Sequence, residues 1–107
     1  MEYADNGDLF QLKIERKKTK NYFTEQEVWK LFIQFLNGLK AFLDFKILHR
    51  DIKSANVFLF KGGICKLGDL NVSKVVGKGL GYTQIGTPYY ASPEIWEEKP
   101  YNSKNDV

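Results

Sequence analysis

The chain of 107 residues lacks the features that mark secreted and membrane-spanning proteins. Cys65 is its single cysteine, so no disulfide can form within the chain, which agrees with a reducing compartment. No apolar run is long enough to cross a bilayer, and residues 1–5 lack the basic and apolar segments of a signal peptide. We therefore expect a cytoplasmic or nuclear protein with no membrane partner.

The chain also lacks a strong excess of charge of either sign. Sixteen basic and thirteen acidic residues leave a net charge of +3, which is too small to indicate a nucleic-acid partner. The densest basic run, residues 16–20, predicts the solvated end of a helix, with a docking patch as the alternative. A hydrophobic content of 43% predicts a globular fold, and the length allows at most one domain.

Two helices are predicted in the N-terminal half. Asp8 can cap a short helix over residues 9–18, and Thr24 can cap a longer one over residues 25–44. Each cap is followed three residues later by a glutamine or glutamate, which is the spacing of a capping box. Along the longer helix, apolar side chains recur at three- and four-residue steps and predict a face in the core: Val28, Leu31, Phe32, Phe35, Leu36, Leu39, Phe42 and Leu43.

The C-terminal half contains shorter signals. Residues 57–60 and 64–67 are strand-like runs, and Lys61-Gly62-Gly63 between them predicts a hairpin turn. Residues 68–100 have many glycines and three prolines, which predicts irregular structure. Residues 102–105 are expected to start another helix.

The segment that carries chemistry is His49-Arg50-Asp51-Ile52-Lys53-Ser54-Ala55-Asn56. It places an aspartate, a lysine two residues on and an asparagine five residues on in one short loop, the arrangement that protein kinases use to transfer phosphate from ATP. Three further motifs follow in order: Asp69-Leu70-Asn71, Gly86-Thr87-Pro88 and Ser92-Pro93-Glu94. The chain therefore resembles the eukaryotic protein kinases of the serine/threonine type, from residue 1 to residue 107.

Several phrases of the sequence are most similar to the NIMA-related kinases. Phe58, followed by Gly68 directly before the aspartate of the second motif, is the sharpest of these marks. That group is associated with cilia, microtubules and the cell cycle. The resemblance implies a cytoplasmic setting, with the cytoskeleton, the cilium or the nucleus as alternatives.

The resemblance assigns catalytic and metal-binding roles. Asp51 is implied as the catalytic base, and Lys53 is implied to stabilise charge on the transferred phosphate. Asn56 and Asp69 are implied as ligands of Mg²⁺, to which they would offer hard oxygen donors. The alternative for each aspartate or asparagine, taken alone, is a loop residue that makes a turn.

The resemblance also assigns a nucleotide site at the N-terminus. Residues 1–4 look like the hinge between the two lobes of a kinase, so the backbone of Glu2 and Ala4 would hydrogen-bond the adenine of ATP. Phe58 would lie beneath the adenine ring. Asp8 would contact the ribose, or would only cap its helix; both readings stay open.

Regulatory residues follow from the same resemblance. Arg50 precedes the catalytic aspartate. Kinases with this arginine are commonly activated by phosphorylation of the activation segment, which the resemblance places here at residues 69–94. Thr83 is the best candidate acceptor, for an upstream kinase or for autophosphorylation, and Thr87 is implied to face the protein substrate. Asp106 resembles the aspartate that holds the backbone of the catalytic loop, and His49 is expected to be structural.

Two departures from the kinase pattern stand out. Asp69-Leu70-Asn71 replaces the usual Asp-Phe-Gly; Asn71 is among the few residues besides glycine that tolerate positive φ, so the loop can still form. Ser92 replaces the usual alanine. We expect metal binding to survive both changes.

The predicted fold is α+β: a partial kinase large lobe over residues 1–107, mainly helical with one small hairpin, with the small lobe and the last helices absent. The predicted function is transfer of the ATP γ-phosphoryl group to a serine or threonine hydroxyl of a protein substrate. The chain alone is expected to be inactive, because the small-lobe groups over the phosphates would precede residue 1. The alternatives are a truncated relative that acts as an interaction module, and an incomplete gene model.

Overall fold

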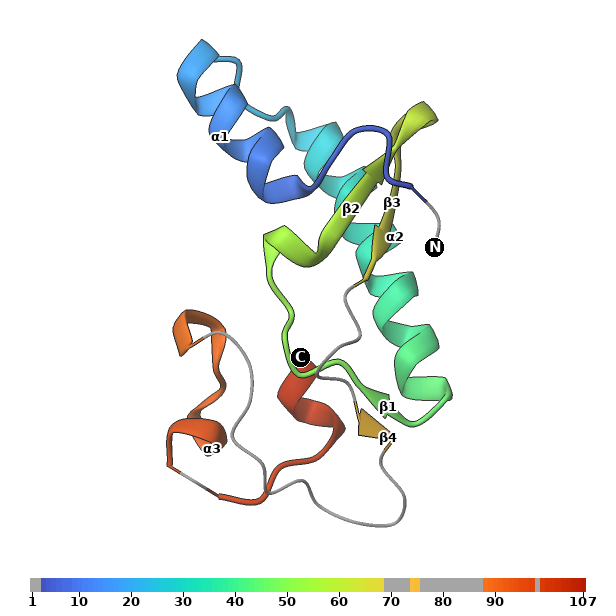
Figure 1. The fold of residues 1–107 in the computed structure, drawn as a ribbon, viewed down its shortest axis with the longest axis vertical. Helices are drawn as coiled ribbons and strands as arrows, with labels where there is room; N and C mark the ends of the chain where they lie inside the picture. Colours follow the sequence, from blue (N-terminus) through green and yellow to red (C-terminus); the bar gives the residue numbers. More distant parts are fainter. Residues whose placement is uncertain (1–2, 69–73, 76–87, 98) are drawn as a thin grey trace. The chain divides into compact units, whose positions relative to one another are not determined.

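The computed structural model describes residues 3–68, 74–75, 88–97 and 99–107. The chain divides into two compact units (Figure 1). The first unit comprises Met1–Gly38 and Ser54–Gly68, and the second comprises Leu39–Lys53 and Asp69–Val107. Each unit is described by itself.

The first unit is built on two capped helices, α1 (Leu9–Thr19) and the N-terminal part of α2 (Glu25–Asp44). At the start of α1, a side-chain oxygen of Asp8 accepts a hydrogen bond from the Gln11 amide at 2.9 Å. At the start of α2, Thr24 and Glu27 exchange backbone-to-side-chain hydrogen bonds of 2.8 and 3.2 Å. Both helices begin where the sequence predicts, and α1 extends one residue beyond the predicted end because Lys20 closes it with a left-handed backbone.

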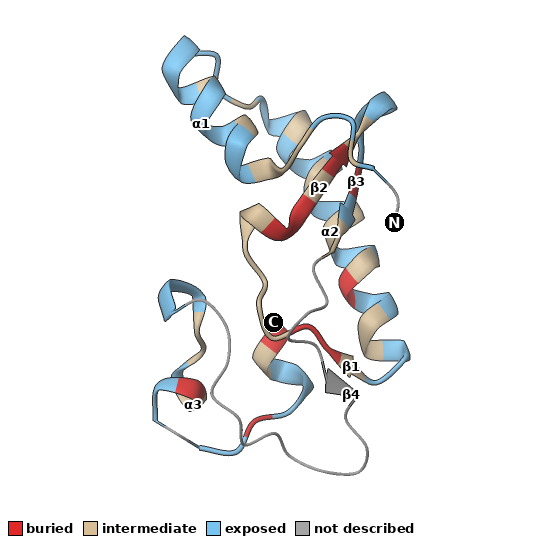
Figure 2. Ribbon diagram, viewed as in Figure 1, coloured by how far each residue is buried: buried red, intermediate tan, exposed pale blue. Residues whose placement is uncertain are grey.

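A β-hairpin supplies the core of the first unit. Strands β2 (Val57–Phe60) and β3 (Ile64–Leu67) pair antiparallel, as predicted, across a 3-10 turn at Lys61–Gly63. Alternate residues of the strands are buried, which gives a core of Val57, Leu59 and Cys65 (Figure 2). The side chains that pack against this core are Leu9, Leu12, Leu31, Phe35 and Leu67.

Cys65 lies inside this core as a small apolar residue, in agreement with its position in a predicted strand. Burial raises the pKa of its thiol above the ordinary value. Its Sγ donates to the Leu31 carbonyl at 3.6 Å. The thiol is therefore protonated and shielded at neutral pH.

The prediction that the whole apolar face of α2 lies in the core is wrong for this chain. Leu31 and Phe35 pack against the hairpin, but Val28, Phe32 and Leu36 are 43–51% exposed. The periodicity correctly identifies a continuous apolar stripe on the helix. The hairpin is narrower than that stripe and covers only part of it.

The second unit contains short elements around a small core. Strand β1 (Ile47–Leu48) pairs antiparallel with β4 (Lys74–Val75). Helix α3 (Pro93–Trp96) begins with proline at its first position. The core consists of Leu48, Ile95 and Tyr101, with Ala91 packed against it.

The prediction of irregular structure over residues 68–100 is therefore incomplete, since β4, α3 and a 3-10 turn at Pro88–Tyr90 lie within it. Each of these elements is four residues or shorter, which is too short for hydrophobic periodicity to reveal. The helix expected from residue 102 is a 3-10 turn at Ser103–Asp106. None of the described helices is long and apolar enough to span a membrane.

Candidate active site

The backbone of the loop at residues 49–51 is held by one carboxylate. The side chain of Asp106 accepts hydrogen bonds from the backbone amides of His49, at 2.6 Å, and Arg50, at 2.9 Å. Asp106 is buried, and the 3-10 turn at Ser103–Asp106 places it beneath the loop. Because a carboxylate that accepts two backbone donors fixes both peptide groups, this contact sets the loop conformation.

The backbone of Arg50 adopts a left-handed conformation, which residues other than glycine rarely take. Its φ is 65°, in the left-handed region. Nη1 of its guanidinium donates to the Tyr101 hydroxyl at 3.1 Å, and Tyr101 is buried in the core of the same unit. The Asp106 carboxylate and the Tyr101 hydroxyl therefore hold Arg50 at both ends, and such strain persists only where the surrounding structure enforces it.

His49 is a structural residue, as expected from the sequence. Its side chain is fully buried, and its ring meets the Phe42 ring edge-on, with centroids 5.5 Å apart. Nδ1 of His49 accepts a hydrogen bond from the Asp51 amide at 3.3 Å. The imidazole thus supports the backbone that carries Asp51.

Asp51 and Lys53 form an ion pair at the end of this supported loop. A carboxylate oxygen of Asp51 lies 3.2 Å from Nζ of Lys53, and the side chains are 13% and 26% exposed. The pair is thus partly desolvated while both groups remain accessible. A carboxylate and an ammonium held together in this way can take a proton from a hydroxyl and stabilise negative charge beside it.

The first unit carries the residues predicted to contact a nucleotide. Backbone hydrogen bonds from Asn6 and to Gly7 attach the segment before α1 to Leu59 of β2. The neighbouring pair, Asp8 and Phe58, forms an isolated antiparallel bridge. The structure thus brings Asp8 and Phe58 together, and it shows the capping role of Asp8.

Phe58 and Gly68 are matched in shape. A Cβ atom at Gly68 would lie 2.8 Å from two carbons of the Phe58 ring, which is closer than real contacts allow. The Gly68 amide also donates to the Asn56 carbonyl at 2.9 Å. Asn56 itself is buried, at the end of the 3-10 turn Ser54–Asn56 that precedes β2. The aromatic ring at position 58 therefore requires the glycine at position 68.

Comparison with known proteins decides the family. The model of the protein kinase domain matches residues 1–107. The chain belongs to the protein kinase family. It is 48% identical to the serine/threonine-protein kinase Nek5 of Homo sapiens and 48% identical to Nek1 of Mus musculus, in each case over the whole chain. It is 45% identical to the putative serine/threonine-protein kinase A of Trypanosoma brucei brucei.

These kinases are much longer than the chain. The chain covers 15% of human Nek5, 9% of mouse Nek1 and 26% of the trypanosome kinase. The family, the serine/threonine type and the similarity to Nek kinases agree with what the sequence predicts. The boundaries of the domain stay a prediction.

Several predicted kinase residues lie outside the described residues: Glu2, Asp69, Leu70, Asn71, Thr83 and Thr87. Asp51 and Lys53 belong to the second unit, whereas Ala4, Asp8, Asn56 and Phe58 belong to the first. Within the first unit, the Ala4 carbonyl accepts a hydrogen bond from the Gly7 amide at 3.2 Å, in the turn that leads into α1.

Two side-chain contacts in the second unit are not predicted by the sequence. One is the Tyr101 hydroxyl that binds Arg50, and the other is the Asn105 side chain, whose Oδ1 accepts a hydrogen bond from Ser92 at 2.6 Å. Neither residue falls in a periodic pattern, and both contacts join segments far apart in the chain. The second contact gives Ser92, which replaces the usual alanine, a partner of its own.

Proposed function

We propose that the protein containing this chain is a serine/threonine protein kinase that transfers the γ-phosphoryl group of ATP to a protein hydroxyl. The observation that carries this proposal is the Asp51–Lys53 ion pair at 3.2 Å, on a loop whose backbone Asp106 holds. Loop aspartates that only make turns do not require such support. Membership of the protein kinase family and similarity to Nek kinases support the same reaction.

In this proposal, Asp51 orients the substrate hydroxyl and accepts its proton during the transfer. Lys53 then offsets negative charge beside the transferred group. His49 and Asp106 act only by fixing the backbone between them, which keeps the Asp51 carboxylate in position.

We propose ATP and Mg²⁺ as the cofactors of this protein. Asn56 and Asp69 would hold Mg²⁺ through oxygen atoms, the ligands that this ion prefers. When bound, the ion neutralises charge on the phosphates. The backbone of Glu2 and Ala4, together with the side chains of Asp8 and Phe58, would hold the nucleoside.

Regulation and substrate contact rest on the activation segment. We propose that phosphorylation of Thr83, by an upstream kinase or by the protein itself, gives the Arg50 guanidinium a phosphate to bind. Thr87 would face the substrate. The proposed setting is the cytoplasm, with the cytoskeleton, the cilium or the nucleus as alternatives, and the partner is a protein with a serine or threonine acceptor.

The test is Asp51→Asn in the full-length protein, assayed with ATP, Mg²⁺ and a generic acceptor protein. Loss of the base is expected to lower kcat by about a hundredfold or more, while the fold and ATP binding are kept. Asp44→Asn is the matched control, because Asp44 is an exposed carboxylate paired with Lys40 on α2. Equal activity of wild type and Asp51→Asn, or no activity in either, would contradict the proposal, and the second outcome would favour a non-catalytic interaction module.

A further inference from the structure

The basic run at the end of α1 has no role in the proposed kinase reaction. Arg16, Lys17 and Lys18 precede Thr19, which is exposed and is the last residue of the helix. An exposed threonine with arginine three positions before it, and lysines between, is the charge pattern that basophilic protein kinases recognise with acidic side chains.

The backbone around Thr19 is suited to entering another enzyme's cleft. Lys20 closes the helix with φ of 55° and ψ of 23°, a left-handed conformation disfavoured for lysine. Residues 21–24 continue without regular structure. Only the last helical turn has to unwind for the segment to become extended, and helix ends fray readily.

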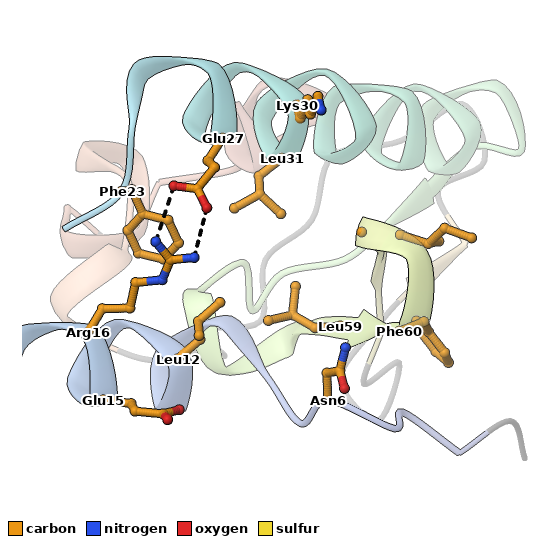
Figure 3. A pocket seen from close by; sticks show the side chains of 12 residues that line it. Asn6, Leu12, Glu15, Arg16, Phe23, Glu27, Lys30, Leu31, Leu59 and Phe60 are labelled. Atoms are coloured by element: carbon orange, nitrogen blue, oxygen red, sulfur yellow. Dashed lines mark hydrogen bonds and ion pairs between the residues drawn. The ribbon is translucent and has the colours of Figure 1, made fainter. Parts of the chain in front are cut away.

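Arg16 already has a structural partner within the same unit. Its guanidinium makes two hydrogen bonds to the Glu27 carboxylate, at 2.8 and 3.1 Å, and lies 4.6 Å from the centre of the Phe23 ring. These bonds, together with the hydrogen bond from the Thr24 amide, lower the pKa of Glu27 to about 2. The pair links the end of α1 to the start of α2 and lines a pocket of about 500 Å³ (Figure 3).

A phosphate on Thr19 would compete for the same guanidinium. Residues three apart on a helix are neighbours, so the side chain of residue 19 can reach that of Arg16. The hydroxyl of Thr19 already lies over this turn, where it donates to the carbonyls of Glu15 and Arg16 at 3.1 and 3.3 Å. A phosphate dianion binds a guanidinium more strongly than a single carboxylate charge does.

We propose that Thr19 is a phosphorylation site of a basophilic serine/threonine kinase, and that its phosphate replaces the Glu27 carboxylate as the hydrogen-bond partner of the Arg16 guanidinium. In the modification, Oγ1 of Thr19 forms a bond to the γ-phosphorus of ATP, the bond between that phosphorus and the bridging oxygen of ADP breaks, and the hydroxyl proton goes to the modifying enzyme's base. The result removes the link between the end of α1 and the start of α2 and changes the lining of the pocket beside it.

The first test uses the full-length protein, carrying Asp51→Asn to suppress autophosphorylation, with an arginine-directed kinase and ATP. Phosphate is located by mass spectrometry. Thr24 is the internal control, because it is also exposed but has Asn21 three positions before it. Phosphate is expected at Thr19 at least about tenfold faster than at Thr24, with transfer retained in Thr19→Ser and lost in Thr19→Ala. Equal rates at the two threonines, or none at Thr19, would overturn the proposal.

The second test follows Arg16 by NMR in arginine-labelled protein. The signals of Arg16 and Arg50 in the full-length protein are assigned with the variants Arg16→Lys and Arg50→Lys, and Arg50, which donates to the Tyr101 hydroxyl in the second unit, is the reference signal. Phosphorylation of Thr19 should shift the guanidinium signal of Arg16, leave that of Arg50 unchanged and raise the pKa of Glu27 from about 2 toward its ordinary value of 4.5. If Thr19 is phosphorylated and the guanidinium signal of Arg16 does not shift, the proposal that Arg16 exchanges Glu27 for the phosphate is wrong.

Discussion

The two units of this chain hold their functional residues by different means. In the second unit, the loop that carries Asp51 is fixed by polar contacts with residues more than fifty positions away, chiefly the Asp106 carboxylate. In the first unit, Phe58 lies on a hairpin whose register is local and whose apolar core is completed by side chains of α1 and α2. Polar side chains therefore hold the loop that carries Asp51, whereas apolar packing holds the hairpin that carries Phe58.

Replacing Asp106 should give the largest loss of stability. In Asp106→Ala, the amides of His49 and Arg50 lose their acceptor in a buried environment, so the free energy of unfolding should fall by about 2–5 kcal/mol. Asp44→Ala removes an exposed carboxylate and should change it by less than about 0.5 kcal/mol. Urea unfolding of both variants provides the measurement. Equal losses of unfolding free energy in the two variants would show that Asp106 does not hold the backbone of the loop at residues 49–51.

Gly68→Ala tests the packing of the first unit. The new methyl group would meet the Phe58 ring at 2.8 Å, so the variant should be about 1–3 kcal/mol less stable. A smaller side chain, in Phe58→Leu, should remove most of the effect of Gly68→Ala. A double-mutant cycle by thermal unfolding measures this coupling, and strictly additive effects would rule out the match in shape.

Gly38→Ala should act in the opposite direction. A Cβ atom at Gly38 would lie 3.7 Å from Cβ of Leu67, which is an ordinary contact, and alanine favours the helix. The variant should therefore gain about 1 kcal/mol of stability. A loss on urea unfolding would mean that Gly38 marks a tighter packing point than the structure shows.

The smallest effect concerns pH. The hydrogen bonds from Arg16 and from the Thr24 amide lower the pKa of Glu27 in the folded state to about 2, below its ordinary value of 4.5. The pair therefore contributes stability above pH 4.5 that is lost as the pH falls toward 2. Glu27→Gln should flatten this part of the stability–pH curve, and an unchanged curve would contradict the role of the pair.

The sequence predicts local structure and chemistry in this chain better than it predicts long-range contacts. The capping boxes at Asp8 and Thr24 and the hairpin at residues 57–67 are encoded within a few positions, so pattern alone finds them. The roles assigned to Asp51 and Asn56 stay predictions, drawn from a motif whose chemistry is general to one family.

The parts that the sequence does not predict depend on partners distant in the chain. Strand β1 pairs with β4 over two residues each, and Arg50 binds Tyr101 across fifty-one positions. The exposure of Val28 and Phe32 depends on how much of α2 its neighbours cover. The contact of Asp106 with the backbone of His49 and Arg50 is the exception among these long-range contacts, because the resemblance to the kinase family predicts it.

The most direct test of this account is the steady-state kinetics of Asp106→Asn in the full-length protein. Asparagine keeps the size of the side chain but offers one acceptor oxygen in place of two, so one amide of the loop loses its partner. We predict that kcat falls by about tenfold to a hundredfold, because Asp51 is misplaced, while KM for ATP stays within about twofold. An unchanged kcat, or a rise in KM for ATP alone, would contradict the claim that Asp106 positions the catalytic loop.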